Sequence, residues 1–466
     1  MPAAIQRIFR VTLLLLPAVA PFLTVTATPR PNVIVILADD LGYGDLSGYG
    51  HPTIKTPVLD QLATEGLKLT NFHSGASVCT PSRMALLSGC YPTQVGWTTG
   101  VIGYKMQPGE GLHPKVVTIA ELFRSAGYAT AISGKWHVGS EVACLPQNQG
   151  FDATLFIDKS NNLSKKLWRG NELVNSQVEN RLLTEIFTAE AVRFINEKKT
   201  TPFFLYVPYT APHFPVQAHP DWKGKSAFGE YGDVVEELDH GIGRILAALK
   251  AEDLEDNTLI LFYSDNGPQP GQKARAEPLR GMKWSPLEGG TRVPFIIRWP
   301  GKIPPASESH ALTSAIDLLP TLCAAATIDW RPHVANAQTV SGFNVLSTWT
   351  QKATEHPRKD LLLWHGMGSC DAILVGKWKL FFDRTKALSG LGIDQELSTN
   401  QQSSLAKLAT GQGPLLFDLE NDVDELIDLS HAQPDRIHAM HQLAKERQAE
   451  ATTNIIPLWQ RPKGKQ

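Results

Sequence analysis

Unbroken apolar runs of strand length recur along the chain. The first, Asn32–Ala38, lacks the apolar–polar alternation of a strand that has one face in water. A run of this kind predicts a strand that is covered on both faces, as the strands of parallel sheets are. The same pattern predicts further strands over Phe203–Val207, Leu259–Tyr263, Pro294–Ile297 and, in shorter form, Ala129–Ile132.

Segments with helical periodicity lie between these runs. Val234–Leu249 places Val235, Leu238 and Ile242 on one face, which predicts an amphipathic helix. Strands that alternate with helices predict an α/β fold: a large, mainly parallel but mixed sheet, sandwiched by helices. The other predicted helices cover Val58–Glu65, Thr118–Ser125 and Leu182–Lys198.

The alternating pattern weakens after about residue 340. Ala372–Phe381 and Pro414–Leu419 predict a short antiparallel sheet, and a helix is expected over residues 435–449. Residues 385–413, rich in Ser, Gln, Leu and Gly, predict an excursion on the surface. We therefore expect an N-terminal catalytic domain over residues 28–355 and a smaller C-terminal subdomain over 356–466.

Composition narrows the class of protein. Hydrophobic residues at 42% and charged residues at 19% are typical of a globular chain and exclude a disordered one. The 44 basic and 46 acidic residues give a net charge of −2, so the chain has no positive field that could hold a polyanion. Nucleic acid is therefore not an expected partner.

The N-terminus has the features of an export signal. Arg7 and Arg10 precede an apolar stretch, and small residues follow it, so residues 1–27 predict a cleaved signal peptide. The alternative is a membrane anchor, but Pro17 and Pro21 interrupt the stretch and it is shorter than a bilayer span. We expect an exported protein, in a periplasmic, secreted or lysosome-like compartment, without stable membrane insertion.

The cysteines are too few for a disulfide scaffold. Their odd number leaves at least one unpaired in an oxidising compartment. Those without any surrounding motif are expected to be structural or simply buried, and these are Cys90, Cys144, Cys323 and Cys370.

Acidic residues follow two of the predicted strands. Asp39 and Asp40 end one strand, and Asp265 and Asn266 end another. Ligands of parallel sheets bind beyond the carboxyl ends of the strands, so these side chains could converge. Their oxygens suit a hard cation such as Ca²⁺ or Mg²⁺ and not zinc. Taken singly, each pair would favour a helix cap or a turn, but two pairs at equivalent strand ends favour a metal site.

A short helix is expected next to Cys79. Pro81 suits the start of a helix and Gly89 suits its end, so Cys79 lies at the N-terminus, where the helix dipole favours an anion. The residue types alone permit either a reactive thiol or a plain buried cysteine.

The segment Cys79-Thr80-Pro81-Ser82-Arg83 resembles the Cys-x-Pro-Ser-Arg core of the sulfatases, and other sulfatase motifs follow in order. The resemblance covers nearly all of the mature chain. It is to the arylsulfatase A type, within the alkaline phosphatase superfamily. The further matching segments are Asp39–Asp45, Gly134–His137, Ala211–His213, Ser264–Gly267, Leu279–Lys283, Glu288–Pro294 and Leu416–Asp422.

The resemblance implies a role for each matching residue. Cys79 would be oxidised to formylglycine by a formylglycine-generating machinery during export. It would complete the shell of one divalent cation, Ca²⁺ rather than Mg²⁺, whose other ligands are Asp39, Asp40, Asp265 and Asn266. Arg83 would hold the formylglycine. The groups around the sulfate would be Lys135, His137, His213 and Lys283, with Ser160 where relatives often have a serine.

The implied activity is hydrolysis of sulfate monoesters, expected on a sulfated small molecule or carbohydrate. The formylglycine hydrate would attack sulfur, and a base, for which His137 is our choice, would collapse the sulfated hemiacetal. The alternatives are a phosphate or phosphonate monoester hydrolase on the same fold and a non-catalytic binder of sulfated glycans. The chain departs from the family at Ser88-Gly89-Cys90, where Thr-Gly-Arg is usual, and Met282 and Trp284 are expected to shape the substrate rim.

Overall fold

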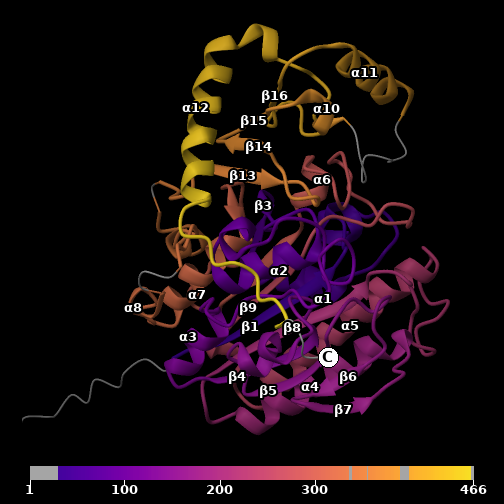
Figure 1. Ribbon diagram of the computed structural model, residues 1–466. Helices are drawn as coiled ribbons and strands as arrows, with labels where there is room; N and C mark the ends of the chain where they lie inside the picture. The colour runs from indigo at the N-terminus through magenta and orange to yellow at the C-terminus, as the bar shows by residue number, and fades with distance from the viewer. Residues whose placement is uncertain (1–29, 335–337, 354, 389–397, 463–466) are drawn as a thin grey trace, which may run out of the picture.

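The computed structural model describes residues 30–334, 338–353, 355–388 and 398–462, so the predicted signal peptide lies outside the described residues. A ten-stranded mixed sheet forms the centre of the larger part (Figure 1). Across the sheet the strands are β11 (Ser307–Ser309), β2 (Leu67–Leu69), β10 (Phe295–Arg298), β9 (Thr258–Ser264), β1 (Asn32–Asp39), β8 (Phe203–Pro212), β4 (Ala129–Lys135), β5 (Ala153–Ile157), β6 (Leu167–Arg169) and β7 (Glu172–Asn175).

The sheet is parallel at its centre and mixed at both sides. Strands β9, β1, β8, β4 and β5 are parallel, whereas β10 is antiparallel to β9 and β6 is antiparallel to β5. The five apolar runs of the sequence are all strands, and the predicted α/β class is confirmed. Five strands toward the two sides of the sheet, β2, β5, β6, β7 and β11, were not predicted, because each has only three to five residues and little apolar pattern.

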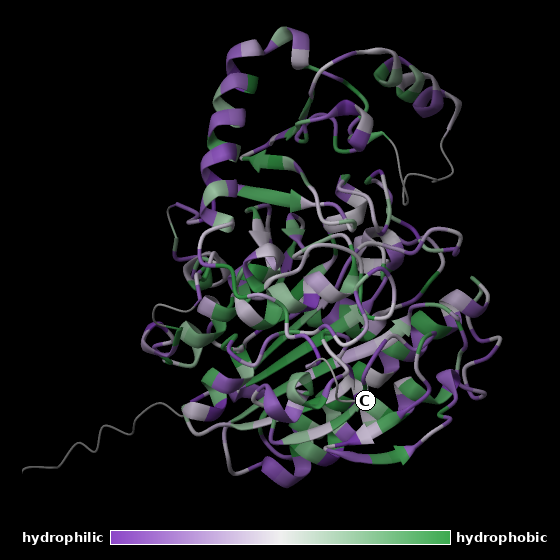
Figure 2. Ribbon diagram, in the orientation of Figure 1, coloured by the Kyte–Doolittle hydropathy of each residue, from purple (hydrophilic) through white to green (hydrophobic). Residues whose placement is uncertain are grey.

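Helices cover both faces of this sheet, which explains why its central strands are apolar throughout. In β1, Val33 and Val35 belong to one core, whereas Ile34 and Ile36 belong to the other. The first core is closed by α2 (Cys79–Ser88), α3 (Ile119–Ser125) and α7 (Leu318–Ala325), and the second by α1 (Pro57–Thr64), α4 (Leu183–Lys198) and α5 (Glu230–Ala251). Green strands between helices with purple outer faces show the same layering (Figure 2).

A second, antiparallel sheet forms the smaller C-terminal part, at the top of Figure 1. The predicted run Ala372–Phe381 is divided by a turn at Gly376 into two strands, and the predicted helix is α12 (Pro434–Ala451). The boundary at residue 355 stays a prediction. The strands of this sheet are β13 (Asp360–Trp364), β14 (Cys370–Val375), β15 (Trp378–Phe381) and β16 (Leu415–Asp418).

The expected surface excursion contains helices. A capping box between Ser398 and Gln401 begins α11 (Thr399–Thr410), which buries only Leu408. With one buried residue it has almost no apolar stripe, so its periodicity could not be seen in the sequence. The remaining short elements are α10 (Arg384–Ala387), α6 (Glu288–Thr291), α8 (Arg331–Val334), α9 (Leu346–Trp349) and the pair β3 (Phe72–His73) and β12 (Thr313–Ser314).

Two observations bear on export and oxidation. Within the described ranges, none of the helices combines the length and the apolar character needed to cross a bilayer. All five cysteines are free thiols, and four of them, Cys79, Cys90, Cys144 and Cys323, are buried.

Candidate active site

The two acidic strand ends lie side by side. Strands β1 and β9 are neighbours, and their register pairs Ala38 with Ser264, so Asp39 and Asp265 follow at the same edge. Asn266 Nδ2 donates to Asp40 Oδ1 at 2.7 Å, and the Asp40 backbone turns away from the strand with φ 65°. The convergence expected from the sequence is present.

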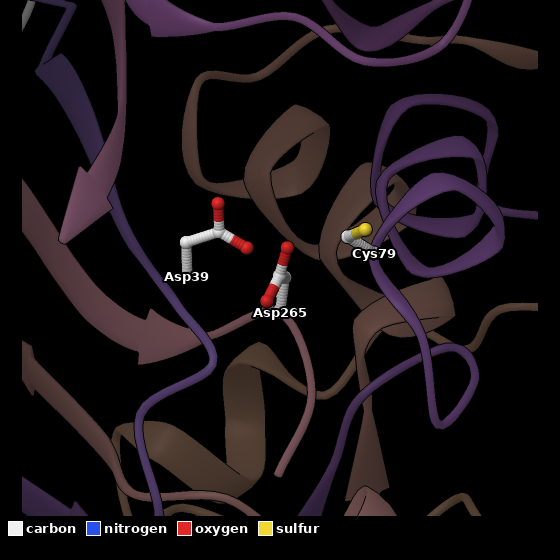
Figure 3. A group of neighbouring side chains, drawn as sticks. All are labelled: Asp39, Cys79 and Asp265. Carbon is white, nitrogen blue, oxygen red and sulfur yellow. The ribbon is translucent and has the colours of Figure 1, made fainter. Parts of the chain in front are cut away.

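This acidic cluster has the properties of a cation site. One oxygen of Asp39, one of Asp265 and the Cys79 sulfur all lie within 4.8 Å of one another (Figure 3). Asp39 Oδ1 and Asn266 Oδ1 are buried and accept no hydrogen bond from the described residues. Burial and the neighbouring Asp39 carboxylate raise the pKa of Asp265, so the cluster resists full ionisation on its own. The donor set therefore fits a divalent cation with oxygen ligands.

Helix α2 presents Cys79 at its first residue. Gly89 ends the helix in the left-handed conformation, with φ 68°, and its N–H donates to Ala85 O at 2.9 Å. Every residue of α2 is buried, so the helix is fixed in the core. Burial raises the pKa of the Cys79 thiol, which keeps the unmodified side chain protonated and weakly nucleophilic.

Arg83, one turn along α2, faces the acidic cluster. Its Nε donates to Asp265 Oδ2 at 2.9 Å, and its Nη1 donates to the Lys135 carbonyl at 2.8 Å. The hydrogen bonds of its guanidinium are thus made to Asp265 and to the end of β4, and not to Cys79. Arg83 thereby fixes the position of Asp265 relative to β4.

Two buried lysines neutralise two of the aspartates. Lys135 Nζ lies 2.6 Å from Asp39 Oδ2, and Lys283 Nζ lies 2.7 Å from Asp40 Oδ1. Burial alone would lower the pKa of Lys283, but the charge of Asp40 outweighs it and raises the pKa. The Lys283 ammonium group therefore stays charged in the core.

The protons of the two histidines can be assigned from their partners. His137 Nε2 lies 3.0 Å from the Ile102 carbonyl, which can only accept, so Nε2 carries the proton. His137 Nδ1 is then a lone-pair acceptor, and it is buried with no partner among the described residues. Burial lowers the pKa of His137 well below its usual value, so the ring is neutral.

His213 has the opposite tautomer. Its Nδ1 donates to the Phe214 carbonyl at 2.6 Å, which leaves Nε2 as the acceptor, 3.2 Å from Ser160 Oγ. Asp40 Oδ2 lies 3.5 Å from the same Nε2. Burial lowers the pKa of His213 to about 4, against the opposing effect of Asp40.

A cavity of about 280 Å³ opens onto these groups. The predicted residues Cys79, His137, Ser160, His213 and Lys283 line it, while Asp39, Asp40, Lys135, Arg83, Asp265 and Asn266 lie fully buried. The sequence did not point to Tyr104, Leu163, Phe214 and Gln269, which also line the cavity. They come from loops with no periodicity and no motif, so only the structure could find them.

Comparisons with known proteins agree with this geometry. The family model described as Sulfatase matches residues 31–328. The chain belongs to the sulfatase family. Human arylsulfatase A is 35% identical over 453 residues, which covers 89% of this chain and 87% of that protein. This sulfatase is also 32% identical to pig N-acetylgalactosamine-6-sulfatase, over 92% of this chain and 88% of the relative.

A solved structure shares the fold over the same extent. It belongs to work on the metabolism of multiple glycosaminoglycans by Bacteroides thetaiotaomicron, with a TM-score of 0.78, 27% identity, and coverage of 91% of this sulfatase and 100% of that chain. The protein is therefore an enzyme that hydrolyses sulfate esters, and its acidic cluster could hold a metal.

Proposed function

We propose that this sulfatase removes sulfate from monosulfated carbohydrates, with formylglycine at Cys79 and Ca²⁺ in the acidic cluster. The observation that carries the proposal is the position of Cys79, which lies both beside Asp39 and Asp265 and in the wall of the cavity. The name of the pig relative, N-acetylgalactosamine-6-sulfatase, supports a sugar sulfate as the substrate.

Four side chains would hold the cation: Asp39, Asp40, Asp265 and Asn266. Asp39 Oδ1 and Asn266 Oδ1 support this assignment, because both are buried and neither accepts a hydrogen bond from the described residues, although Arg83 Nη2 lies 3.6 Å from Asp39 Oδ1. Calcium tolerates irregular carboxylate geometry better than magnesium does. When bound, it would supply positive charge that acidifies a hydroxyl and binds a sulfate oxygen.

Modification of Cys79 would replace a weak nucleophile by a better one. The raised pKa of its thiol shows that burial disfavours the thiolate. A formylglycine hydrate supplies two hydroxyls, one for attack on sulfur and one for release of sulfate. Arg83 and Asp265 form a rigid wall behind the helix N-terminus that presents this residue.

The two lysines would hold the sulfate group and its developing charge. Each has a fixed partner, Lys135 with Asp39 and Lys283 with Asp40, so each is oriented before substrate binds. Lys283 also lines the cavity, and Ser160 lies within reach of the same space.

The two histidines would divide the proton transfers. His137 Nδ1 is the free acceptor and would remove a proton during release of sulfate. His213 would protonate the departing alcohol from Nε2. A bound sulfate ester adds negative charge beside this ring, which raises the pKa of His213 toward the range that a general acid needs.

Export fits the requirement for a modifying partner. The signal peptide predicted at residues 1–27 would bring the chain to a formylglycine-generating machinery on its way to an exported compartment.

The test is the mass of the Cys79 peptide taken from active protein, combined with turnover of the sulfate and the phosphate ester of one phenol. We expect formylglycine and a strong preference for the sulfate ester. Only thiol or disulfide at Cys79 in active enzyme would contradict the modification, and equal turnover of the phosphate would favour a phosphoesterase.

A further inference from the structure

Exposed apolar side chains surround the entrance of the catalytic cavity. In the described part of the chain, nine large apolar side chains are exposed, and three of them, Tyr104, Leu163 and Phe214, line this one cavity. Trp284 lies beside them, with its ring centroid 5.7 Å from that of Tyr104. We call these four residues the cavity rim. Apolar side chains that gather at one exposed place indicate a binding surface.

Backbone contacts hold the rim in place before substrate arrives. Tyr104 and Val101 exchange two backbone hydrogen bonds of 2.9 Å, and the Leu163 N–H donates to Ser160 O at 2.8 Å. The Trp284 N–H donates to Ser77 O at 2.8 Å. A surface of this kind binds at low cost in conformational entropy, because its side chains are carried by ordered loops.

The rim provides almost no charge. Among the residues that line the cavity, Lys283 is the one permanently charged side chain, and it is paired with Asp40. Asn162 and Gln269 add neutral polar groups. Lys105 lies over the Tyr104 ring, 5.5 Å from its centroid, but is not part of the lining. Within the cavity lining, a second anion on the substrate would therefore leave water without an unpaired cation to receive it.

We propose that the cavity rim selects a single ring that carries no charge apart from its sulfate ester. This inference rests on the proposed function and names its substrate class: the apolar face of one sugar or phenyl ring packs on Tyr104 and Trp284. The cavity volume of about 280 Å³ lies just below the usual range of ligand pockets, roughly 300–1,000 Å³. It suits one ring with its sulfate, at the end of a chain, and not an internal residue of a polysulfated chain.

The test compares two phenyl sulfates that differ by one charge. The first is the methyl ester of 4-carboxyphenyl sulfate, and the second has the free 4-carboxylate. Sulfate release is measured with enzyme whose Cys79 is modified. We expect kcat/KM to be at least about tenfold higher for the ester, since the carboxylate meets an apolar rim.

Variants separate the rim from intrinsic reactivity of the two phenols. Leu163→Lys should raise kcat/KM for the carboxylate about fivefold relative to the ester, because it adds a cation at the entrance. Leu173→Lys is the matched control. The two leucines have similar exposure, 41% for Leu173 and 43% for Leu163, but Leu173 lies on β7 and is not part of the cavity lining. It should leave the ratio unchanged.

The outcomes are distinct. An unchanged ratio in Leu163→Lys, or equal use of both substrates by the unsubstituted enzyme, would overturn the rim selectivity while leaving the sulfatase assignment in place. If neither substrate releases sulfate, the proposed function is overturned, and the inference with it.

Discussion

Two buried ion clusters of similar composition lie in different places in this sulfatase. One joins Asp39, Asp40 and Asp265 to Lys135 and Lys283 at the edge of the large sheet. The other lies between α6 and the C-terminal sheet. There Lys379 Nζ contacts Glu288 Oε1 and Glu425 Oε1, each at 2.8 Å. All three of its side chains are fully buried.

The clusters differ in what they leave open. The catalytic cluster borders a cavity, and its Asn266 Oδ1 is buried without a hydrogen-bond donor among the described residues. In the second cluster one lysine serves both glutamates, and the Glu288 N–H donates to Glu425 Oε2 at 2.8 Å. The second cluster also anchors the segment that carries Lys283, because Arg280 Nη2 donates to the Glu425 carbonyl at 2.7 Å. Similar residues thus build a reactive site in one place and a structural fastening in the other.

The largest effect should come from a substitution in the catalytic cluster. We expect Asp265→Asn to lower kcat by at least about 1,000-fold, because it removes a carboxylate that is a proposed metal ligand and the partner of Arg83. Calcium at 100 times its Kd should stabilise the unsubstituted protein by about 2.7 kcal/mol and the variant far less, measured by thermal unfolding.

Asp239→Asn serves as the control for Asp265→Asn. Asp239 is a buried aspartate that accepts from the backbone N–H groups of Val58 and Leu59, so its loss should cost stability but preserve the response to calcium. Full activity after exhaustive chelation would contradict the metal assignment.

The two histidines beside the catalytic cluster should differ in how the effect of their substitution on kcat depends on the leaving group. We expect His213→Ala to lower kcat by about 10²–10⁴ on a sugar sulfate and much less on nitrophenyl sulfate, whose phenolate leaves without a proton. His137→Ala should impair both substrates alike. Equal losses for His213→Ala on the two substrates would mean that it only binds sulfate, and Lys283 would become the candidate acid.

A substitution in the second cluster should affect the free energy of unfolding more than the catalytic rate. Lys379→Met would leave Glu425 buried without an ion-pair partner among the described residues, and Glu288 with Arg292 alone, at 3.4 Å. We therefore expect a loss of about 3–5 kcal/mol in the free energy of unfolding. Displacement of the segment that carries Lys283 should also lower kcat/KM by about 10-fold. Both effects are measured by denaturant unfolding and by steady-state kinetics.

A second substitution sharpens this test. Glu288→Gln added to Lys379→Met removes one of the two buried glutamate charges that Lys379 contacts. The double variant should therefore be more stable than Lys379→Met alone. Additive losses would instead show that the ion pairs do not interact.

The smallest effect is expected at a buried carboxylate outside both clusters. Burial raises the pKa of Glu237 to about 7, and no cation among the described residues forms an ion pair with it. The unfolded chain releases this proton near pH 4.5, whereas the folded protein keeps it up to about pH 7. Stability is therefore lost as pH rises through this window and stays lower above it.

Glu237→Gln should remove this pH dependence. The variant should match the unsubstituted protein near pH 4 and exceed its stability by about 1–3 kcal/mol at pH 8, in paired unfolding curves. A difference that does not change with pH would contradict the raised pKa of Glu237.

The parts of the site that the sequence predicted share one property: they are tied to the ends of strongly patterned elements. Asp39 and Asp265 follow strands whose apolar runs could not be mistaken, and sheet topology then brought them together. Cys79 begins a helix with a recognisable start and end. Residue type and position along the chain were sufficient to place these residues, whereas their expected roles came from the resemblance to the sulfatases.

The residues that sequence missed owe their place to tertiary contacts. Lys379 alternates within a strand like any solvated lysine, and only the packing of β15 against α6 shows that it is buried between Glu288 and Glu425. Tyr104 and Leu163 lie in loops whose positions are set by contacts with distant segments. A single sequence contains no local signal for either.

The distance along the chain between Cys79 and its neighbours sets an order of events. Cys79 is 1% exposed in the packed helix α2, so an enzyme that converts it as proposed would have to reach it before this packing is complete. Asp265 is made roughly 190 residues after Cys79, and at about 5–20 residues per second this takes roughly 10 to 40 s. Until β9 pairs with β1, Asp265 does not lie beside Asp39 and Cys79, and the site is incomplete. If Cys79 is converted to formylglycine as proposed, the pairing of β9 with β1 would end the period in which it can be converted.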